Sequence, residues 1–372
     1  MSDDSLKNKP VPRRRVARLS RMVQLATGVA GGMLAEGGRQ LTQGKRPKAK
    51  DLLLTPANAR RVTDQLAHLR GAAMKVGQML SMDTGDMLPK ELTDILARLR
   101  SDAQAMPAAQ LEQVLIDAYG EDWHDALYSF EYDPLAAASI GQVHKAVSQK
   151  GEHIVLKIQY PGVRESIDSD IDNVATLLRI SGLLPDGIDI QPLLAVAKEQ
   201  LRDEADYLKE ADYLQRYSAL LADDERFLLP SVDEELTTPE ILAMSYVPGA
   251  PIESLAKKSQ KERDRIMSLL LELFFRELFE FRLVQTDPNF ANYAYDATTC
   301  QLVLLDFGAT QAFDEDFAEG YRELLAAALA EDRQQIQEAA EAIGYALGED
   351  ETYRELVFEL FQMATEPLCY KG

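Results

Sequence analysis

The residues of this chain that are best suited to chemistry lie in its second half, in two short segments. Asp287 and Asn292 are five residues apart, and Asp306 follows an apolar run and precedes a Phe-Gly pair. Phosphoryl transfer needs metal ions that bridge the phosphates, a carboxylate near the attacking oxygen and a lysine on the phosphates. We therefore predict that Asp287 is the catalytic carboxylate and that Asn292 and Asp306 bind magnesium.

The alternative explanation for these segments is purely structural. Asp287-Pro288-Asn289 can form a turn, and Asp306 can simply end a strand. A lone Asp-Phe-Gly tripeptide is weak evidence, because tripeptides recur by chance. The order of the segments is more specific, since a long apolar helix precedes Asp-x4-Asn, and a strand, a turn and a second strand lead to Asp306. We therefore favour the chemical interpretation.

A lysine and a loop of small residues upstream supply the other parts that phosphoryl transfer needs. Lys157 lies in the apolar run 154–158, where a solvent-facing position is hard to arrange. We predict that it contacts the phosphates, and the alternative is a lysine that protects an edge strand. The preceding hairpin loop, which we predict to cover ATP, contains Ala136, Ala137, Ala138 and Ser139. Alanine permits close backbone approach but restricts φ, so this loop is stiffer than a glycine loop.

Acidic residues downstream of the lysine are candidates to hold it in position. The hydrophobic pattern predicts a single helix from Gln191 to about Leu221. One glutamate on this helix, Glu204 or Glu210, is predicted to hold Lys157 in position, and our final assignment is Glu210. Glu204 and Asp206 are two residues apart, so they point to nearly opposite sides of a regular helix unless the helix bends.

An early helix, predicted over residues 57–82, offers a partner for these acids. Lys75 and Gln78 are three residues apart on one face of it. Gly77 costs about 1 kcal/mol relative to alanine inside a helix, and such a glycine usually marks a close contact. Lys75 is a candidate partner of Glu204 or of Asp206. Taken alone, the short Lys-x-Gly-Gln segment favours a purely structural role, and a role in gating the site depends on the motifs described below.

The elements that must position these residues are helices, then a small sheet with inserted helices, then a mostly helical region. The predicted helices span residues 57–82, 89–103, 107–119, 163–184, 191–221 and 262–283, with a further series over 315–363. The predicted strands span residues 135–147, 152–159, 227–232, 240–246, 293–295 and 301–305. Pro248, Gly249 and Pro251 break the chain at a predicted lobe boundary.

The composition is that of a folded protein with an acidic body and a basic amino-terminal arm. Hydrophobic residues make up 46% of the 372 residues, and the net charge is −21. The first 50 residues nevertheless hold 12 Lys or Arg against 3 Asp or Glu. An acidic body argues against nucleic-acid binding, because phosphate backbones need clustered cations. Two cysteines and four dispersed histidines argue against a disulfide framework or a zinc site.

Residues 13–34 of the arm raise the question of membrane contact. Five arginines precede an apolar stretch, which is typical of an amphipathic helix on an anionic membrane surface. The alternatives are a solvated tail or a helix docked on the acidic body, and the Gly28-x3-Gly32 spacing would also permit helix pairing in a homodimer. The sequence has neither a run of about 18 apolar residues nor a signal-peptide shape. We expect a cytoplasmic protein that is not secreted, with the inner face of a membrane as the surface for the arm.

In this order the motifs resemble the UbiB family of atypical kinases, also called the aarF-domain-containing kinases, and most closely its coenzyme Q branch. The resemblance runs from about Ala57 to Thr310. The motifs that carry it are Lys75-Val76-Gly77-Gln78, Ala136-Ala137-Ala138-Ser139, Lys157, Glu204-Ala205-Asp206, Gln285-Thr286-Asp287-Pro288-Asn289 with Asn292, and Asp306-Phe307-Gly308.

The resemblance implies an α+β, two-lobed, protein-kinase-like fold with ATP and Mg²⁺ as cofactors. In such a fold a helical extension places the Lys-x-Gly-Gln helix over the active site. The implied parts are an arm at 1–50, the helical extension at 51–128, an N-lobe with inserted helices at 129–247 and a mostly helical C-lobe at 248–372. The implied adenine-facing hinge between the lobes is Ala243, Met244, Ser245 and Tyr246.

The resemblance also implies a role in the biosynthesis of isoprenoid quinones such as ubiquinone. It favours ATP hydrolysis, or action on a small lipid-like substrate, over protein phosphorylation. Quinone-precursor lipids and quinone-biosynthesis proteins are the implied partners. The chain shows no carboxy-terminal transmembrane pair, no Ala-Pro-Glu-like segment after Asp306 and no His or Arg before Asp287. These departures weaken the case for protein kinase activity.

The sequence leaves three alternatives open. A non-catalytic nucleotide-binding scaffold for quinone-biosynthesis enzymes would keep the fold, but the intact Asp287, Asn292 and Asp306 argue against it. A small-molecule kinase of the aminoglycoside-phosphotransferase type shares Asp-x4-Asn, yet it has no reason to carry the Lys-x-Gly-Gln segment at Lys75. A protein kinase in the ordinary sense is the least supported.

Overall fold

The computed structural model describes residues 69, 71–73, 75–77, 79, 105–181, 190–345, 348 and 350–369. The chain divides into two compact units, of which the first comprises Met1–Ser218 and Leu229–Val247 and the second Ala219–Leu228 and Pro248–Gly372. The segment Ala219–Leu228 lies inside the range predicted for the N-lobe, but it groups with the second unit. The basic stretch 13–34 and the predicted helix 89–103 lie outside the described residues.

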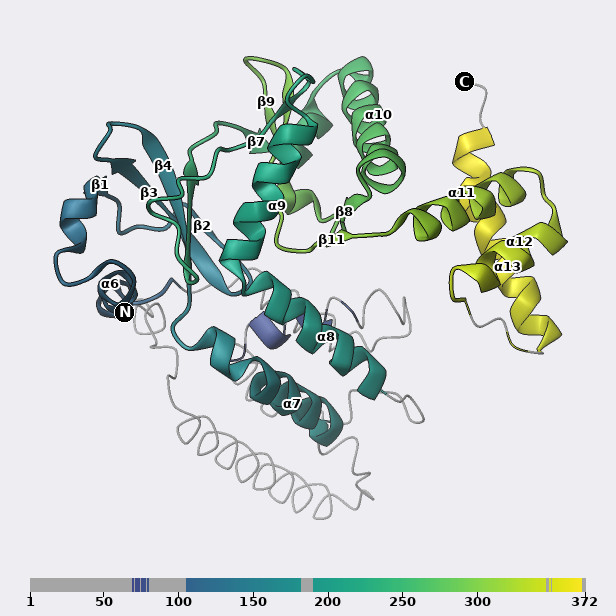
Figure 1. The fold of residues 1–372 in the computed structure, drawn as a ribbon, viewed down its shortest axis with the longest axis horizontal. Coiled ribbons are helices and arrows are strands. Elements are labelled where there is room, and N and C mark those ends of the chain that lie inside the picture. Colours follow the sequence, from purple (N-terminus) through teal and green to yellow (C-terminus); the bar gives the residue numbers. More distant parts are fainter. Residues whose placement is uncertain are drawn as a thin grey trace, which may run out of the picture. The chain divides into compact units, whose positions relative to one another are not determined.

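The first unit is built on an antiparallel sheet, shown in Figure 1. Its strands are β1 (Leu127–Phe130), β2 (Ala136–Ala137), β3 (Gly141–Ser148), β4 (His153–Gln159) and β6 (Ile241–Ser245). The strand order is β1-β3-β4-β6, with β2 paired to β3. After its first residue β4 is buried along its whole length, because β3 and β6 flank it. The apolar run that surrounds Lys157 therefore forms a central strand.

A hydrophobic cluster joins this sheet to the helix that precedes it. Helix α6 (Ala108–Tyr119) follows Pro107, as the sequence predicts, and a 3-10 turn (Trp123–Ala126) leads into β1. Leu115 and Trp123 are buried against Leu156 and Ile158 of β4. The strand that carries Lys157 is thus fixed by packing on both sides of the lysine.

Three further helices belong mainly to the first unit, and they correct one prediction. They are α7 (Val163–Ser181), α8 (Gln191–Glu204) and α9 (Tyr207–Leu220). The single helix expected over 191–221 is wrong, because the chain breaks at Ala205 and Asp206. The Gln159 side chain donates to the Ala205 carbonyl at 2.7 Å, and the Asp206 carboxylate accepts from the Lys209 N–H at 3.3 Å, which caps α9.

The second unit contains a small mixed sheet and a two-stranded ribbon. The sheet has the order β5 (Phe227–Leu228), β10 (Gln301–Leu304), β9 (Tyr293–Asp296) and β7 (Ala250–Pro251), and the ribbon pairs β8 (Leu283–Gln285) with β11 (Thr310–Ala312). Strand β5 is parallel to β10. The strand predicted over 227–232 is much shorter than expected, and Pro230, which has no N–H for a ladder, follows shortly after β5.

The long helix expected over 262–283 ends earlier than its apolar pattern suggests. Helix α10 (Gln260–Arg276) continues into a π-helical turn, η5 (Glu277–Phe281), and Arg282 then adopts a left-handed conformation with φ of 53°. The chain reverses there and enters β8. A π-helical turn is rare and is often found at functional sites. This turn directly precedes the segment of Asp287.

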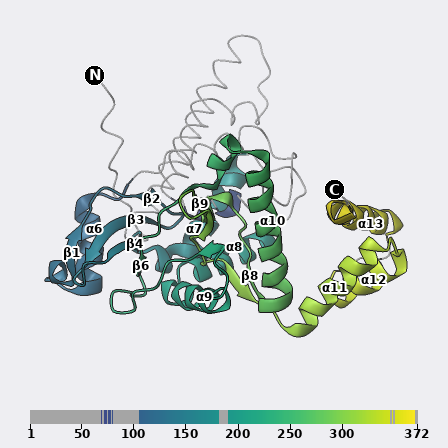
Figure 2. The same ribbon diagram turned by 90° about the horizontal axis from the view of Figure 1, so that it is seen from above.

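The described residues after Asp314 form helices, as predicted. They are α11 (Glu315–Leu329), α12 (Arg333–Ala342) and α13 (Glu351–Thr365), followed by the turn η7 (Glu366–Cys369). Figure 2 shows α11, α12 and α13 lying beside one another. Each begins at an aspartate whose carboxylate accepts from backbone N–H groups, namely Asp314, Asp332 and Asp350.

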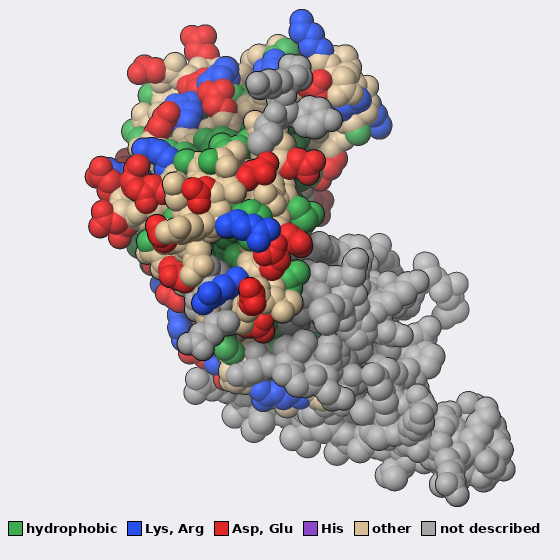
Figure 3. Space-filling model, turned by 90° about the vertical axis from the view of Figure 1, so that its right-hand side faces the viewer, with side chains coloured by type: hydrophobic (Ala, Val, Ile, Leu, Met, Phe, Trp, Pro, Cys, Tyr) green, Lys and Arg blue, Asp and Glu red, His purple; other side chains and the backbone are tan. Residues whose placement is uncertain are grey.

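The described surface agrees with the acidic composition. In Figure 3, acidic side chains gather over much of the described face, with basic ones interspersed among them. Among the described residues, no helix combines the length and the apolar character that crossing a membrane requires.

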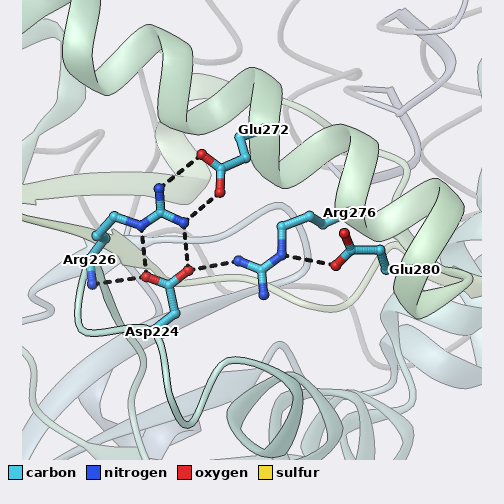
Figure 4. A network of polar contacts seen from close by, with 5 residues as sticks. All are labelled: Asp224, Arg226, Glu272, Arg276 and Glu280. Atoms are coloured by element: carbon cyan, nitrogen blue, oxygen red, sulfur yellow. Dashed lines mark hydrogen bonds and ion pairs between the residues drawn. The ribbon is translucent and has the colours of Figure 1, made fainter.

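An ion network fixes Ala219–Leu228 onto helix α10 (Figure 4). Asp224 accepts from Arg226 Nε at 2.8 Å and from Arg276 Nη1 at 2.7 Å. Arg226 also donates to Glu272 at 2.9 Å, and Arg276 donates to Glu280 at 3.2 Å. The two guanidinium groups hold the pKa of the Asp224 carboxyl well below its usual range.

A buried histidine completes a second network, in the first unit. The His144 ring lies 2.9 Å from the Glu131 carbonyl through Nδ1 and 2.6 Å from the Gln142 amide nitrogen through Nε2. A carbonyl only accepts, so Nδ1 carries the proton and Nε2 accepts from Gln142. The Gln142 oxygen in turn accepts from the Met106 N–H at 2.8 Å. A second proton, on Nε2, would place the ring N–H against the N–H of the Gln142 amide. Burial lowers the pKa of His144.

Replacing Asp224 by Asn should lower the free energy of unfolding by about 1–2 kcal/mol, because its charge-assisted hydrogen bonds to two guanidinium groups are weakened. The pKa of Asp224 is lowered, so its contribution is present above the ordinary carboxyl pKa and is lost as the pH falls toward the lowered value. Chemical denaturation at neutral and acidic pH should show the gap between wild type and variant closing in acid. Asp212→Asn is the matched control, because it removes only an exposed ion pair, in which Asp212 lies 3.9 Å from Arg216. This variant should lower the free energy of unfolding by less than about 0.5 kcal/mol. Equal losses for both variants would contradict the role of the network.

His144 should make the protein less stable as the pH falls below about 6.5. The folded state resists protonation because the pKa of His144 is lowered, so the unfolded state takes up the proton first and is favoured. Between pH 7.5 and pH 5.5 the free energy of unfolding should fall by about 1 kcal/mol more in wild type than in His144→Gln. The same replacement at the exposed His153 should leave the wild-type slope in place. An unchanged slope in His144→Gln would contradict this assignment.

Candidate active site

Lys157 and Glu210 form a buried ion pair in the first unit. Lys157 Nζ lies 2.7 Å and 2.9 Å from the two carboxylate oxygens of Glu210. Only 6% of the lysine side chain and 1% of the glutamate side chain are exposed. The Tyr207 ring lies 5.3 Å from Nζ. Because β4 is a central strand, the alternative of a lysine protecting a sheet edge is wrong.

The alanine-rich loop, residues Ala136–Ser139, forms a tight turn that leads into β3, the neighbour of the strand that carries Lys157. Ala136 and Ala137 pair with β3, and the Ala138 N–H donates to the Gly141 carbonyl at 3.0 Å. None of these four residues, all within the described chain, has a positive φ, so alanine is compatible with the turn. Glycine is needed only at its base, because a Cβ on Gly141 would lie 2.3 Å from the Ile158 carbonyl oxygen.

The acids at the break between α8 and α9 have different partners. Glu204 accepts a hydrogen bond from the Ser139 hydroxyl, and its Oε2 lies 3.8 Å from Lys75 Nζ. Asp206 is drawn instead to the backbone of α9, which it caps. Gly77 is helical and buried, and Gln78 lies outside the described residues. The structure thus brings Lys75, Ser139 and Glu204 together.

The predicted hinge lies on the strand next to Lys157. Ala243 and Met244 are buried in β6, and Met244 pairs with Val155 of β4. The Ser245 N–H donates to the Ser231 carbonyl at 2.8 Å, and the Tyr246 N–H to the His153 carbonyl at 2.9 Å. These two donors are thus used within the unit, and a role of this segment in adenine binding stays a prediction.

In the second unit, the segment of Asp287 folds back on itself through side-chain amides. Asn292 Nδ2 donates to the Asp287 carbonyl at 3.0 Å, and Asn289 accepts from the Ala291 N–H at 3.1 Å. The Leu305 N–H donates to the Asn292 carbonyl at 3.0 Å. Asn292 is therefore fixed beside the residue that directly precedes Asp306.

One residue that the sequence analysis gave no role, Gln285, joins the two acidic segments. Its side chain is buried, its Oε1 accepts from the Asp287 N–H at 2.7 Å, and its Nε2 donates to the Asp306 carbonyl at 2.9 Å. The buried Glu277 of the π-helical turn accepts from the Gln285 N–H at 3.3 Å. The available signal was a polar residue ending an apolar strand directly before Thr286-Asp287.

Charges around this segment also act on a neighbouring phenol. Burial, and then the charges of Glu277 and Asp287, raise the pKa of Tyr293 well above its usual value. Tyr293 therefore stays protonated at neutral pH. Its hydroxyl is a neutral group close to two carboxylates.

The donor set at Asn292 and Asp306 fits a hard divalent cation. The Asn292 NH₂ group is committed to Asp287, so its side-chain oxygen is the atom left for a ligand, and one Asp306 oxygen is held by the Gly308 N–H at 3.0 Å. Mg²⁺ takes oxygen ligands and typically uses only one or two protein groups together with substrate phosphates. Within the described residues, no group of three or more His, Cys, Asp or Glu could hold a metal on its own.

Comparisons with known proteins agree on one family. A model described as the ABC1 atypical kinase-like domain matches residues 98–340. The chain is 42% identical over 345 residues to atypical kinase COQ8, mitochondrial, of Saccharomyces cerevisiae, covering 93% of this chain and 69% of that protein. It is 40% identical over 380 residues to COQ8B of Rattus norvegicus, covering 100% of this chain and 71% of that protein.

A solved structure extends the agreement to the fold. The complex of Rv3197 with erythromycin, from Mycobacterium tuberculosis, matches with a TM-score of 0.58 and 27% sequence identity, over 82% of this chain and 78% of that one. The α+β, kinase-like fold expected from the motifs is therefore confirmed.

Gln285→Leu should lower kcat for magnesium-dependent ATP turnover by at least ~10-fold, because it leaves the Asp287 N–H and the Asp306 carbonyl without their shared partner. Affinity for the nucleotide should change little, since the amide is buried away from solvent. Gln301→Leu is the matched control, because Gln301 also donates to two backbone carbonyls of this unit, those of Glu225 and Phe227. Thermal denaturation should show comparable losses for both variants, and an equal loss of kcat in both would contradict a specific role for Gln285.

Proposed function

Because the chain belongs to the ABC1 atypical kinase-like family, we propose that it binds ATP with magnesium and turns over the γ-phosphate. The observation that carries the proposal is the buried pair of Lys157 and Glu210. Burial of two charges carries a large desolvation penalty, so an ion pair that is so fully removed from water is weak evidence for a purely stabilising role. A lysine held in one position beside a loop of small residues is suited to contact phosphate oxygens.

We assign the remaining roles on the same basis. Lys157 contacts the α- and β-phosphates and Glu210 aligns it, while the loop Ala136–Ser139 covers the phosphates and the segment Ala243–Tyr246 takes the adenine. Asn292 and Asp306 hold magnesium, which when bound neutralises charge on the phosphate oxygens. Asp287 orients the attacking oxygen and accepts its proton. Lys75, Gly77 and Gln78 gate the site together with Glu204 and Asp206.

The proposed organisation follows the predicted parts of the chain. Residues 51–128 would be the helical extension that carries the gating helix, 129–247 the N-lobe and 248–372 the C-lobe. With a helix over the site, water or a small lipid-like molecule is the proposed acceptor rather than a protein.

The names of the relatives suggest the wider role. The similar proteins of yeast and rat are atypical kinases named COQ8 and COQ8B, mitochondrial. We propose that this chain likewise supports coenzyme Q biosynthesis, acting near quinone-precursor lipids and the enzymes that use them. The arm at 13–34 is the proposed contact with an anionic membrane, at which the protein would be peripheral.

Asp306→Asn should reduce magnesium-dependent ATP hydrolysis at least ~100-fold, because the metal loses its charged ligand. Phosphate release from purified protein would be measured with and without anionic liposomes. Asp316→Asn, at an exposed position of the same unit, is the control and should keep wild-type turnover. Undiminished hydrolysis in Asp306→Asn would contradict the assignment. Tight nucleotide binding by wild type without turnover under any condition would instead support a scaffold.

A further inference from the structure

The break between α8 and α9 is a junction of the first unit at which four elements meet. Gln159 of β4 donates to the Ala205 carbonyl at 2.7 Å. A Cβ on Gly141, at the base of the alanine-rich loop, would lie 3.1 Å from the Tyr207 hydroxyl, and the ring of Tyr207 lies 5.3 Å from Lys157 Nζ. A shift of this junction would therefore also displace the loop and Lys157.

One carboxylate at this junction is shared by two other elements. The Ser139 hydroxyl, on the last residue of the alanine-rich loop, donates to Oε1 of Glu204. Lys75 of the early helix approaches Oε2 of the same group at 3.8 Å. A carboxylate has room for both partners, since its two oxygens offer about four lone-pair sites. Only 8% of the Lys75 side chain and 18% of the Glu204 side chain are exposed, so water competes little for these contacts.

A glycine of the early helix brings it directly against the same loop. A Cβ on Gly71 would lie 3.0 Å from Ile140 Cγ2 and 3.2 Å from the Ser139 carbonyl oxygen. Alanine is the better helix former by about 1 kcal/mol, so intrinsic helix propensity does not explain a glycine here. The close approach of the helix to the loop explains the glycine at position 71. The early helix and the loop therefore touch through backbone as well as through Glu204.

We propose that Ser139 is a positioning residue that couples the alanine-rich loop to the early helix through the shared carboxylate of Glu204. None of the four loop residues has a positive φ, and alanine restricts φ, so the loop has few conformations and contacts at its base set its position. Loss of either partner of Glu204 loosens both elements. The coupling also has a consequence that rests on the proposed function, in which the loop covers the phosphates of ATP. Nucleotide binding at the loop then changes the stability of the early helix.

The coupling is testable without nucleotide, by hydrogen exchange of the free protein. The reporters are the Ala138 N–H in the loop and the Ala73 N–H in the early helix, which donates to the Leu69 carbonyl at 2.8 Å. Lys75→Met should speed exchange in the loop about tenfold, through loss of the ion pair with Glu204. Ser139→Ala should speed exchange in the early helix about tenfold, through loss of a hydrogen bond to a charged group.

Two further variants make the nucleotide-free test decisive. The double variant Lys75→Met, Ser139→Ala should exchange no faster than the faster single variant, since both act through Glu204. Ser129→Ala, at an exposed position of β1, should change neither reporter. Effects confined to the element that carries each substitution, or effects that multiply in the double variant, would overturn the coupling.

Gly71→Ala gives an independent line of evidence. Its methyl group should push the loop away and speed exchange at both reporters, although alanine favours the helix. Slower exchange in the early helix with an unchanged loop would show that the contact carries no coupling.

Magnesium-ATP then separates this inference from the proposed function. In wild type it should slow exchange in the loop and change exchange in the early helix, whereas in Ser139→Ala only the loop should respond, and Ser139→Thr should restore the wild-type response. An early helix that responds equally in wild type and in Ser139→Ala would overturn the inference. If magnesium-ATP affects neither element while the nucleotide-free coupling persists, the proposed function fails and the coupling stands.

Discussion

The contact between two opposite charges removed from water governs the first unit. Lys157 and Glu210 are each almost fully buried, and desolvation would make both unfavourable if the geometry were loose. The lysine must therefore stand on a central strand, and the glutamate must project from a helix whose first turn is fixed. The break at Ala205 and Asp206 meets the second need, because Asp206 caps α9 one turn before Glu210. Because of the same break, Glu204 at the end of α8 faces a different direction, toward Ser139 and Lys75.

In the second unit, neutral amide groups hold the segments of Asp287 and Asp306 in position. Asp287 and Asp306 are half-buried, and neutral amide groups fix the backbone around them. Gln285 holds one atom of each segment, and Asn292 holds the Asp287 carbonyl. Amides suit this task because they offer a donor and an acceptor without a charge. Amides therefore fix the two segments without adding a charge beside the carboxylates that we propose to serve as metal ligand and base.

The sequence was sufficient to predict the structure where a local pattern of residue types is compatible with only one arrangement. An apolar run around Lys157 predicts a central strand, and the pairing with Glu210 follows once a helix is placed nearby. The break between α8 and α9 was not predictable, because the Gln159 side chain that stabilises it comes from a distant strand. The role of Gln285 was hidden for the same reason, since its partner Asp306 lies 21 residues away. Strand β8 was hidden because its apolar residues continue the pattern of α10.

The alanine-rich loop shows how such long-range contacts shape function. A glycine loop can change shape within itself, so its contacts at the base matter less. A loop whose residues all keep negative φ has few conformations, and what remains adjustable is its position as a whole. That position is set by Gly141 against β4 and by Ser139 against Glu204. In this chain, the residues that determine access to the loop are therefore expected to lie beneath it and beside it rather than within the run of alanines.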